Sequence, residues 1–340
     1  MPEFKPKIIL AGGGTMGSVS PLLAIAQNYA AQYLFVGTAT GPEREAVAAS
    51  GIDFKSISSA KLRRYFSLRN FIDSFKALVA VVQGINILKK FRPDLILTAG
   101  SFVAVPVAVA AWFLKIPVVI HQQDLEIGLS NKMMAPLAEK ISVVFKEQAK
   151  YFKTSKVVVT GNPVRIVKTL PVARPRILIT GGGLGARGMN NFVGQFIPEL
   201  CQKYDVHHIL GEKNWDQRLD CPNYFPYQFV TEQMGELLAT ADIIISRAGM
   251  SLISEAAALK KALILIPITD SHQEKNAAFF ARHNAAYVVK QGSKHIMNRY
   301  LSKLTDSDKL RLELGQNLYN IFPRNWQKKY AELIDSVLNK

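Results

Sequence analysis

Cysteine is almost absent from this chain, whose 340 residues include only Cys201 and Cys221 and no CxxC pair. A disulfide framework is therefore not expected, and a reducing compartment such as the cytoplasm fits the composition. Tracts of low complexity are also lacking, so we expect an ordered chain apart from its ends. After Met1 no apolar segment leads to a small-residue cleavage site, and we expect no secretory signal.

Long apolar runs are equally scarce. The longest extends from Phe102 to Ile120 and is interrupted by Pro106, Lys115 and Pro117. Because a transmembrane helix needs about 20 consecutive apolar residues, we expect this stretch to form a helix (107–114) and then a strand. The six histidines and two cysteines form no cluster with the spacing of metal ligands, so we predict no bound metal.

Acidic residues are few compared with basic ones: 26 Asp and Glu stand against 42 Lys and Arg, a formal net charge of +16. Such a surface favours an anionic partner, which could be nucleic acid, a phosphorylated metabolite or anionic lipid. The sign of the charge does not choose among these three.

The chain contains one pattern twice. Residues 5–14 read KPKIILAGGG and residues 174–183 read RPRILITGGG, and a helix-like segment follows each copy (21–31 and 189–204). An apolar run that ends in glycines before a helix is typical of a buried parallel strand leading to a phosphate-facing helix. Two such openings predict two similar α/β domains with a cleft between them, an arrangement frequent among transferases with nucleotide-sugar donors.

The domain boundaries follow from this repeat. We expect Rossmann-like, doubly wound domains at 1–162 and 176–324, a proline-containing linker at 163–175, and an amphipathic helix at 325–340 that returns to the first domain. The strands are expected at residues 8–11, 34–36, 94–98, 118–120, 141–145, 157–160, 177–180, 207–210, 227–230, 243–245, 263–266 and 287–289.

Both glycine loops match the GxGxxG fingerprint, at residues 12–17 and 183–188. The match is weak, because the acidic residue that would bind an adenine-side ribose is missing directly after the second strand, at residues 35–38. Neither loop ends in GK[ST], so NAD, FAD and P-loop nucleotides are all disfavoured. Two interpretations stay open: close approach of a phosphate or sugar to the backbone, or tight packing of strand against helix.

The segment SRAGMSLISE at residues 246–255 is the most specific feature of the second half. It follows a predicted strand and begins a helix, where backbone N–H groups and the helix dipole could hold a diphosphate without a metal. Glu255 could accept both hydroxyls of a ribose, and the HQEKN run at 272–276 could bind sugar hydroxyls. The alternative is that Glu255 is a solvated helix residue and HQEKN a polar helix start.

Together these segments resemble the MurG family over nearly the whole chain. The resemblance rests on AGGGTMGSVSPLLA, HQQD, NK (131–132), GNPVR, GGGLGAR, SRAGMSLISE and HQEKNA, in that order. It implies a two-lobed GT-B fold and inverting transfer of N-acetylglucosamine from UDP-GlcNAc to lipid I, which yields lipid II. It also implies peripheral attachment to the anionic inner face of the cytoplasmic membrane, with no cofactor beyond possible stimulation by a divalent cation.

The resemblance also implies the residues of the site. Gly14, Phe102 and Asn131 fall on the acceptor side. The donor side comprises Thr15, Met16, Gly17, Asp124, Arg165, Gly183, Asn190, Val230, Arg247, Met250, Ser251, Leu252, Ile253, Ser254, Glu255, Gln273 and Asn276.

The departures from the family gather on the acceptor side. The family's first loop ends Gly-Gly-His, and that histidine is the usual candidate base, but here Ser18 replaces it and no histidine precedes His121. The family's His-Glu-Gln-Asn is here His-Gln-Gln-Asp, its Tyr is Phe102, and the serine of the second glycine loop is Gly183.

A serine does not titrate near neutral pH, so we interpret Ser18 as a helix N-cap. Asp124 follows a strand and becomes the predicted base, with His121 second. The alternatives are a structural His121 and an Asp124 that caps a turn.

Residues 61–69 mix cations with aromatic residues and suit an anionic bilayer or a pyrophosphate. The apolar positions 68, 71, 72, 75, 78, 79 and 82 of the following helix are expected to be core. Two rivals to the lipid I transferase remain open: a UDP-sugar transferase with another lipid acceptor, and a UDP-GlcNAc-binding protein without turnover. A third, a nucleic-acid binder, is supported by charge alone and lacks any recognised module, so we expect no nucleic-acid partner.

Overall fold

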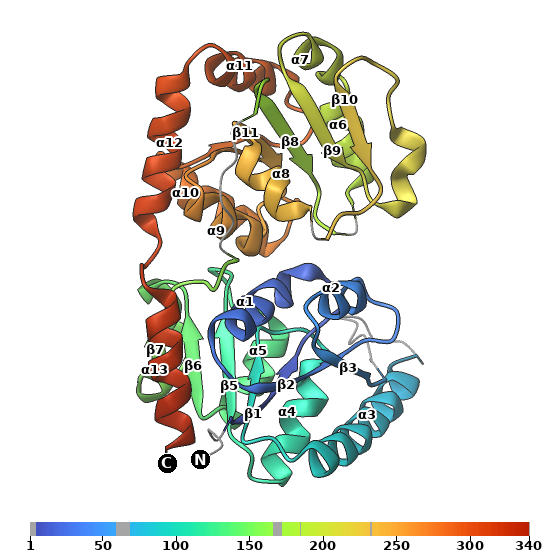
Figure 1. Ribbon diagram of the computed structural model, residues 1–340, viewed down its shortest axis with the longest axis vertical. Helices are drawn as coiled ribbons and strands as arrows, with labels where there is room; N and C mark the ends of the chain where they lie inside the picture. The colour runs from blue at the N-terminus through green and yellow to red at the C-terminus, as the bar shows by residue number, and fades with distance from the viewer. Residues whose placement is uncertain (1–4, 59–68, 166–171, 184, 232, 340) are drawn as a thin grey trace. The chain divides into compact units, whose positions relative to one another are not determined.

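The computed structural model of the chain describes residues 5–58, 69–165, 172–183, 185–231 and 233–339, without the side chains of 69–75. The chain divides into two compact units, shown in Figure 1. Unit 1 contains Met1–Pro163 and Pro323–Lys340, and unit 2 contains Val164–Phe322. The segment predicted as a linker, 163–175, is divided between the units after Pro163, and its residues 166–171 lie outside the described residues.

Unit 1 is built on a parallel sheet of seven strands in the order β3-β2-β1-β4-β5-β6-β7. The strand order reverses beside β1, so the carboxyl ends of β1 and β4 form the switch point at which such folds bind ligands. The strands are β1 (Lys7–Ala11), β2 (Gln32–Gly37), β3 (Asp53–Ser56), β4 (Leu95–Thr98), β5 (Val118–Gln122), β6 (Lys140–Val143) and β7 (Val157–Val159).

One face of this sheet packs on helices α3 (Arg69–Phe91) and α4 (Ala104–Phe113). Alternate strand residues such as Ile9 and Ile96 share a core with Leu88 and Val107 of these helices. The helices approach closely at Gly84, where a Cβ would lie 3.2 Å from the Cβ of Ala110. Because both faces of the central strands are covered, these strands are continuous apolar runs.

The C-terminal helix α13 (Trp326–Leu338) belongs to unit 1 and lies beside β6 and β7 (Figure 1). It contacts α1 (Ser20–Asn28), and the Tyr29 hydroxyl beyond that helix donates to Asp335 at 2.7 Å. The fully buried Tyr330 donates its hydroxyl to Ser142 of β6 at 2.8 Å. The apolar stripe of this tail is therefore core of the first unit.

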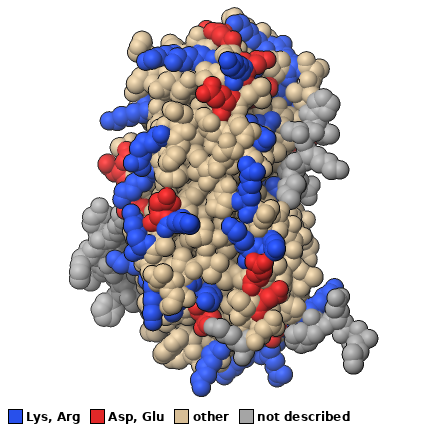
Figure 2. Space-filling model, turned by 90° about the vertical axis from the view of Figure 1, so that its left-hand side faces the viewer, with Lys and Arg blue, Asp and Glu red and all other residues tan. Residues whose placement is uncertain are grey.

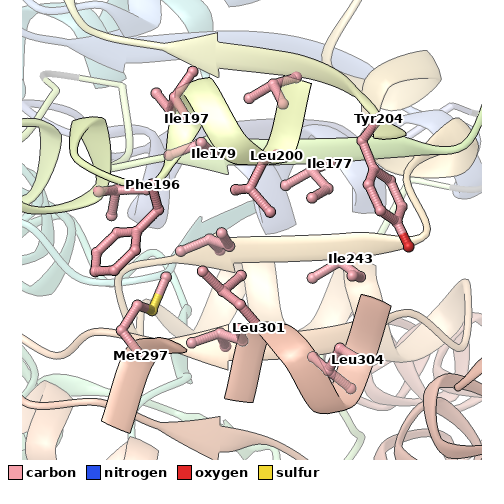
Figure 3. Close-up of a cluster of buried hydrophobic side chains, with 14 of the residues drawn as sticks. Ile177, Ile179, Phe196, Ile197, Leu200, Tyr204, Ile243, Met297, Leu301 and Leu304 are labelled. Atoms are coloured by element: carbon pink, nitrogen blue, oxygen red, sulfur yellow. The ribbon is translucent and has the colours of Figure 1, made fainter. Parts of the chain in front are cut away.

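Unit 2 repeats the plan with six parallel strands in the order β10-β9-β8-β11-β12-β13. Helices α6 (Arg187–Gly194), α7 (Ile197–Lys203) and α11 (Lys294–Thr305) pack on one face of the sheet, and Figure 3 shows the resulting core. The strands are β8 (Arg176–Thr180), β9 (Asp205–Ile209), β10 (Tyr224–Tyr227), β11 (Ile243–Ser246), β12 (Ala262–Leu265) and β13 (Tyr287–Val288).

The remaining helices complete the alternation of strand and helix. They are α2 (Glu43–Ala49), α5 (Leu129–Met134), α8 (Met234–Thr240), α9 (Met250–Ala258), α10 (His272–Arg282) and α12 (Asp308–Ile321). Two parallel, doubly wound sheets confirm the predicted α/β class and the Rossmann-like plan of each unit. Within the described residues, no helix combines the length and apolarity that crossing a membrane requires.

Three details of the sequence-based assignment were wrong. Strand β3 was missed because it is a short, polar edge strand. The strand expected at 227–230 lies at Tyr224–Tyr227 and contains Pro226, which an edge strand tolerates. The helix expected at 189–204 is two helices, because the chain breaks between Gly194 and Ile197.

Candidate functional site

The second glycine loop follows β8 at the switch point of unit 2, between β8 and β11. A Cβ on Gly181 would collide with Ala186, and one on Gly185 with the carbonyl of Leu210, so these two glycines serve tight packing. Gly182, at φ +93°, has open space around the position of a Cβ. Gly181 and Gly185 thus serve packing, whereas Gly182 leaves room for a ligand to approach the backbone. Gly183, next to Gly182, is partly buried.

Helix α9 begins at the same edge, directly after β11. Its N-cap is Gly249, in an extended conformation that supplies no side-chain cap. Met250, Ile253 and Ser254 are buried, whereas Ser251 and Leu252 are partly exposed. Backbone N–H groups of the first turn are thus the groups that can face an anion here, as the helix dipole favours.

Glu255 lies in the second turn of α9 and is paired with Arg165. Its Oε1 lies 3.9 Å from Arg165 Nε, and its side chain keeps a small exposed fraction, 11%. Burial raises the pKa of Glu255, and the Arg165 guanidinium acts in the opposite direction. A carboxylate held in this way, one turn from the start of α9, has the two oxygens needed to accept two ribose hydroxyls.

Arg247 connects three loops of unit 2. Its Nη1 donates to the carbonyls of Ile266 (3.0 Å) and Pro267 (3.2 Å), and its Nη2 donates to Gln291 at 2.9 Å. Burial lowers the pKa of this guanidinium. The structure therefore gives Arg247 a bracing role between the ends of β11 and β12.

Two predicted donor-binding amides are buried within unit 2. Asn190 donates to the carbonyl of Leu210 (3.0 Å) and to Gln217 (3.1 Å), and its Oδ1 lies 3.3 Å from His208 Nε2. Asn276 is fully buried and donates to the carbonyl of Ala248 at 3.0 Å. Direct donor contact by these two side chains does not fit this burial; they hold the loops after β9 and β11.

Two other predicted donor residues lie at the surface of unit 2. Gln273, in the first turn of α10, accepts from the backbone N–H of Ile268 at 3.2 Å. Val230 follows β10 and is partly exposed. Both leave backbone or side-chain atoms accessible at the edge of the unit.

The first glycine loop, in unit 1, is held by hydrogen bonds from its own backbone N–H groups to other residues of the unit. The N–H of Gly12 donates to Val36 (3.1 Å), that of Gly13 to Ser18 Oγ (3.3 Å), and that of Gly14 to Glu43 Oε2 (3.1 Å). Gly14, Thr15 and Gly17 are nevertheless exposed, and Met16 is partly so.

Ser18 was predicted to be the N-cap of the following helix, but the structure shows that it is not. It ends a short 3₁₀ turn, Met16–Ser18, and the N-cap of α1 is Val19. The Ser18 hydroxyl is buried and lies within reach of the carbonyl of Thr15 (3.4 Å) as well as the N–H of Gly13. It therefore closes the glycine loop on itself.

Glu43 is a residue that the sequence analysis missed. It begins α2 and is fully buried, and its Oε1 accepts from the N–H of Thr38 (2.8 Å) and from Thr38 Oγ1 (2.6 Å). Its other oxygen accepts from Gly14. The sequence did hold a signal for it: an acidic residue in the first turn of the helix after the second strand. That residue lies five positions beyond residues 35–38, where a ribose-binding acid was sought.

His121 is a structural residue of unit 1. Its Nδ1 lies 2.8 Å from Ser142 Oγ and its Nε2 lies 2.6 Å from Asn162 Oδ1. The ring is 1% exposed, and burial lowers its pKa to about 4. Both nitrogens are therefore engaged inside the unit, which argues against His121 as a base and favours the structural alternative.

Asp124 lies just beyond β5, partly buried, at the carboxyl edge of the sheet. Its carbonyl accepts from Gln122 Nε2 at 2.7 Å, and the neighbouring Gln123 donates to the carbonyl of Gly17 at 2.7 Å. The structure thus brings together the loop that carries Asp124 and the first glycine loop.

The predicted acceptor residues lie near this edge. Asn131 is 4% exposed and donates to Gln122 (2.8 Å) and to the carbonyl of His121 (3.1 Å), so it braces the loop instead of facing solvent. Phe102 follows β4 and is partly buried. In the part of the chain that the structure describes, no three His, Cys, Asp or Glu residues could hold a metal ion together.

Each unit matches one half of a known glycosyltransferase family. Residues 8–143 match the Glycosyltransferase family 28 N-terminal domain, and residues 176–320 match the Glycosyltransferase family 28 C-terminal domain.

Relatives of similar length bear one name, UDP-N-acetylglucosamine–N-acetylmuramyl-(pentapeptide) pyrophosphoryl-undecaprenol N-acetylglucosamine transferase. That of Clostridium botulinum (strain 657 / Type Ba4) is 37% identical over 84% of this chain and 86% of its own. That of Clostridium perfringens (strain ATCC 13124) is 38% identical over the same shares of the two chains.

A solved structure gives the same picture. The crystal structure of Acinetobacter baumannii MurG has a TM-score of 0.70 and 25% identity, over 97% of this chain and 99% of its own. The S. aureus MnaA–UDP structure, with a TM-score of 0.73 and 14% identity over 99% and 97%, shares the fold.

Proposed function

The chain belongs to the MurG family of glycosyltransferases, and we propose on that basis that it transfers N-acetylglucosamine from UDP-GlcNAc to the muramyl C4 hydroxyl of lipid I, forming lipid II. The observation that carries this proposal is similarity across both units at once. The similarity to the named relatives and to the MurG crystal structure covers both the donor half and the acceptor half of the chain.

The donor is proposed to bind unit 2. Its diphosphate would lie on the first-turn N–H groups of α9, and Glu255 would accept the ribose hydroxyls. During transfer the bond between the anomeric carbon and the UDP oxygen breaks, and negative charge grows on the diphosphate. The helix dipole and the Arg165 guanidinium are fixed charges that stabilise this leaving group.

The base is proposed to be Asp124 in unit 1. The acceptor hydroxyl attacks the anomeric carbon from the face opposite UDP, which inverts the configuration, and its proton must pass to a nearby base. Ser18 does not titrate near neutral pH, and His121 has both nitrogens engaged in a buried network. Asp124 remains as the candidate carboxylate in the loop that touches the first glycine loop.

The transfer assay uses labelled UDP-GlcNAc and a short-chain lipid I analogue. We expect the wild-type protein to form the lipid II analogue and D124N to lose about 10²- to 10⁴-fold in kcat, the usual contribution of a general base. The matched control is E126Q, which removes a carboxylate two residues further along the same loop and should retain turnover. Full turnover by D124N would reject Asp124 as base, whereas intact UDP-GlcNAc binding without any transfer would point to another acceptor.

Attachment to the membrane is proposed to use helices α3 and α4. Among the apolar positions predicted as core, Leu78 (66%) and Val82 (57%) are exposed, whereas Val79 is half-buried. On α4, Trp112 and Phe113 are also exposed, at 56% and 61%. The predicted residues 61–68 of the basic loop lie outside the described residues.

The same two helices also carry exposed cations near their ends. Lys89 and Lys90 occupy the last turn of α3, and Lys115 follows α4; all three are exposed. Figure 2 shows that Lys and Arg side chains are also spread over another face of the molecule, among neutral and acidic residues. Aromatic side chains flanked by lysines suit the headgroup region of an anionic bilayer.

A vesicle assay tests this surface. Serine at both Trp112 and Phe113 should weaken binding to vesicles rich in anionic phospholipid by about 10-fold or more, because burial of one large apolar side chain is worth about 1.5–3 kcal/mol. The control L312S changes a similarly exposed apolar residue of unit 2 and should bind normally. Equal binding by both variants, or binding that does not weaken with salt, would contradict the proposal.

A further inference from the structure

Gln148 makes an unusual set of contacts with the loop that carries Asp124. It lies in a 3₁₀ turn, Lys146–Tyr151, that follows β6, and its side chain is fully buried. Its Nε2 lies 3.2, 2.8 and 2.8 Å from the carbonyl oxygens of Gln122, Gln123 and Asp124. Its Oε1 accepts from the N–H of Phe145 at 2.6 Å.

Three successive carbonyl groups that point at one atom would repel one another without a donor between them. The amide of Gln148 supplies that donor, and the bond from Phe145 fixes the amide's own orientation. Each carbonyl belongs to a different peptide plane, so the contacts constrain the path of the loop over consecutive residues. A buried carbonyl that lost this donor would be left without a hydrogen bond, which disfavours this path of the loop.

Other amides complete the restraint. Gln122 donates to the carbonyls of Asp124 (2.7 Å) and Glu126 (3.0 Å), and Gln123 donates to Gly17. Gln148 differs from them because it comes from outside the loop and is attached to a neighbouring strand. It therefore ties the loop to the turn that follows β6.

We propose that Gln148 is a positioning residue for glycosyl transfer: it sets the place of Asp124 by holding residues 122–124 and touches no substrate itself. The proposal rests on the transfer proposed above and on Asp124 as its base. Misplacement of a reacting group by about 1 Å can cost on the order of 100-fold in rate, so the loss of Gln148 should reduce kcat.

The experiment compares Q148E and Q148M with the wild-type protein. Glutamate keeps the size of the side chain but, when ionised, turns an oxygen toward three carbonyls; methionine keeps the volume and removes the donor. The matched control is Q27E, the same chemical change at an exposed position of α1. We expect kcat to fall about 10- to 100-fold in both variants, with the dissociation constant for UDP-GlcNAc within about 2-fold of wild type, since unit 2 is unchanged.

The pH dependence separates positioning from a general loss of structure. Burial among carbonyls raises the pKa of the introduced carboxyl, and its protonated form is again a donor. From about pH 8.5 down to about pH 5.5, the kcat of Q148E relative to wild type should therefore rise, whereas that of Q148M should stay low. Hydrogen exchange of residues 121–126, measured on the same proteins, should be faster in Q148M than in Q27E.

Wild-type kcat in both Gln148 variants would overturn the inference, as would a loss in Q148E that does not recover at low pH. If the wild-type protein itself transfers nothing to lipid I, the proposed function fails, and hydrogen exchange still decides the positioning role. In that case unchanged exchange of residues 121–126 in Q148M would overturn it, and faster exchange confined to that loop would support it.

Discussion

Replacing Glu43 by glutamine should open the first glycine loop and destabilise unit 1. One carboxylate oxygen accepts from the N–H and hydroxyl of Thr38, and the other accepts from the N–H of Gly14. A glutamine can keep its oxygen on the Thr38 side, but its NH₂ group then faces the N–H of Gly14. Because both groups are donors, no hydrogen bond forms between them. A buried hydrogen bond to a charged group contributes about 1.5–3 kcal/mol, so we expect E43Q to lose about that much.

The matched control for this change is E45Q, which alters an exposed acid in the same first turn of α2. It reproduces the loss of charge near the helix start, worth about 0.3–1 kcal/mol, without touching the glycine loop.

The readout is fluorescence in a W215F background, where the buried Trp326 reports on unit 1. The midpoint of thermal unfolding should fall by about 3–10 °C in E43Q. An E43Q midpoint no lower than that of E45Q would refute the argument.

Two further predictions concern the buried polar network of unit 1. The His121 pKa is lowered from 6.5 to about 4 by burial, so the unfolded chain binds more protons between these values, and stability falls as the pH drops through that window. Relative to H121Q, the wild-type protein should lose about 3 kcal/mol of stability between pH 7 and pH 4, measured by urea unfolding; parallel curves would contradict this. Y330F should cost about 0.5–1.5 kcal/mol in the same assay because it removes the buried bond to Ser142. Y29F, which removes a more exposed bond to Asp335, should cost less, and the reverse order would contradict the burial argument.

The fold was accessible from sequence because its signals are local. The buried central strands are uninterrupted apolar runs such as Ile8–Ala11, and glycine turns mark where each copy of the pattern ends. The errors fell at the sheet edges, where β3 is polar and β10 contains Pro226, because edge strands need not be apolar on both faces.

The candidate site was only partly accessible, because motif matching does not separate a side chain that faces a ligand from one that holds a loop. Asn190, Asn276 and Asn131 all match motif positions, yet each is buried and bonded to a backbone carbonyl. Glu43 and Gln148, in contrast, belong to no motif and were therefore missed, although both hold loops of the candidate site. Their roles depend on contacts with residues up to 29 positions away, which no local pattern records.

The hydrogen bonds of the HQQD segment, residues 121–124, explain why an amide suits position 122. Gln122 donates to the carbonyls of Asp124 and Glu126 and accepts from Asn131, so an amide at this position uses both its ends. An ionised carboxylate at this position would have no hydrogen to donate and would face two carbonyls in a buried site, which costs free energy. The hydrogen bonds of the loop therefore favour an amide at position 122, and the nearest carboxylate of the same loop is that of Asp124, the proposed base. Asp124 lies next to Gln123, whose amide binds the carbonyl of Gly17, so the carboxylate proposed as base stays in the loop beside the first glycine loop.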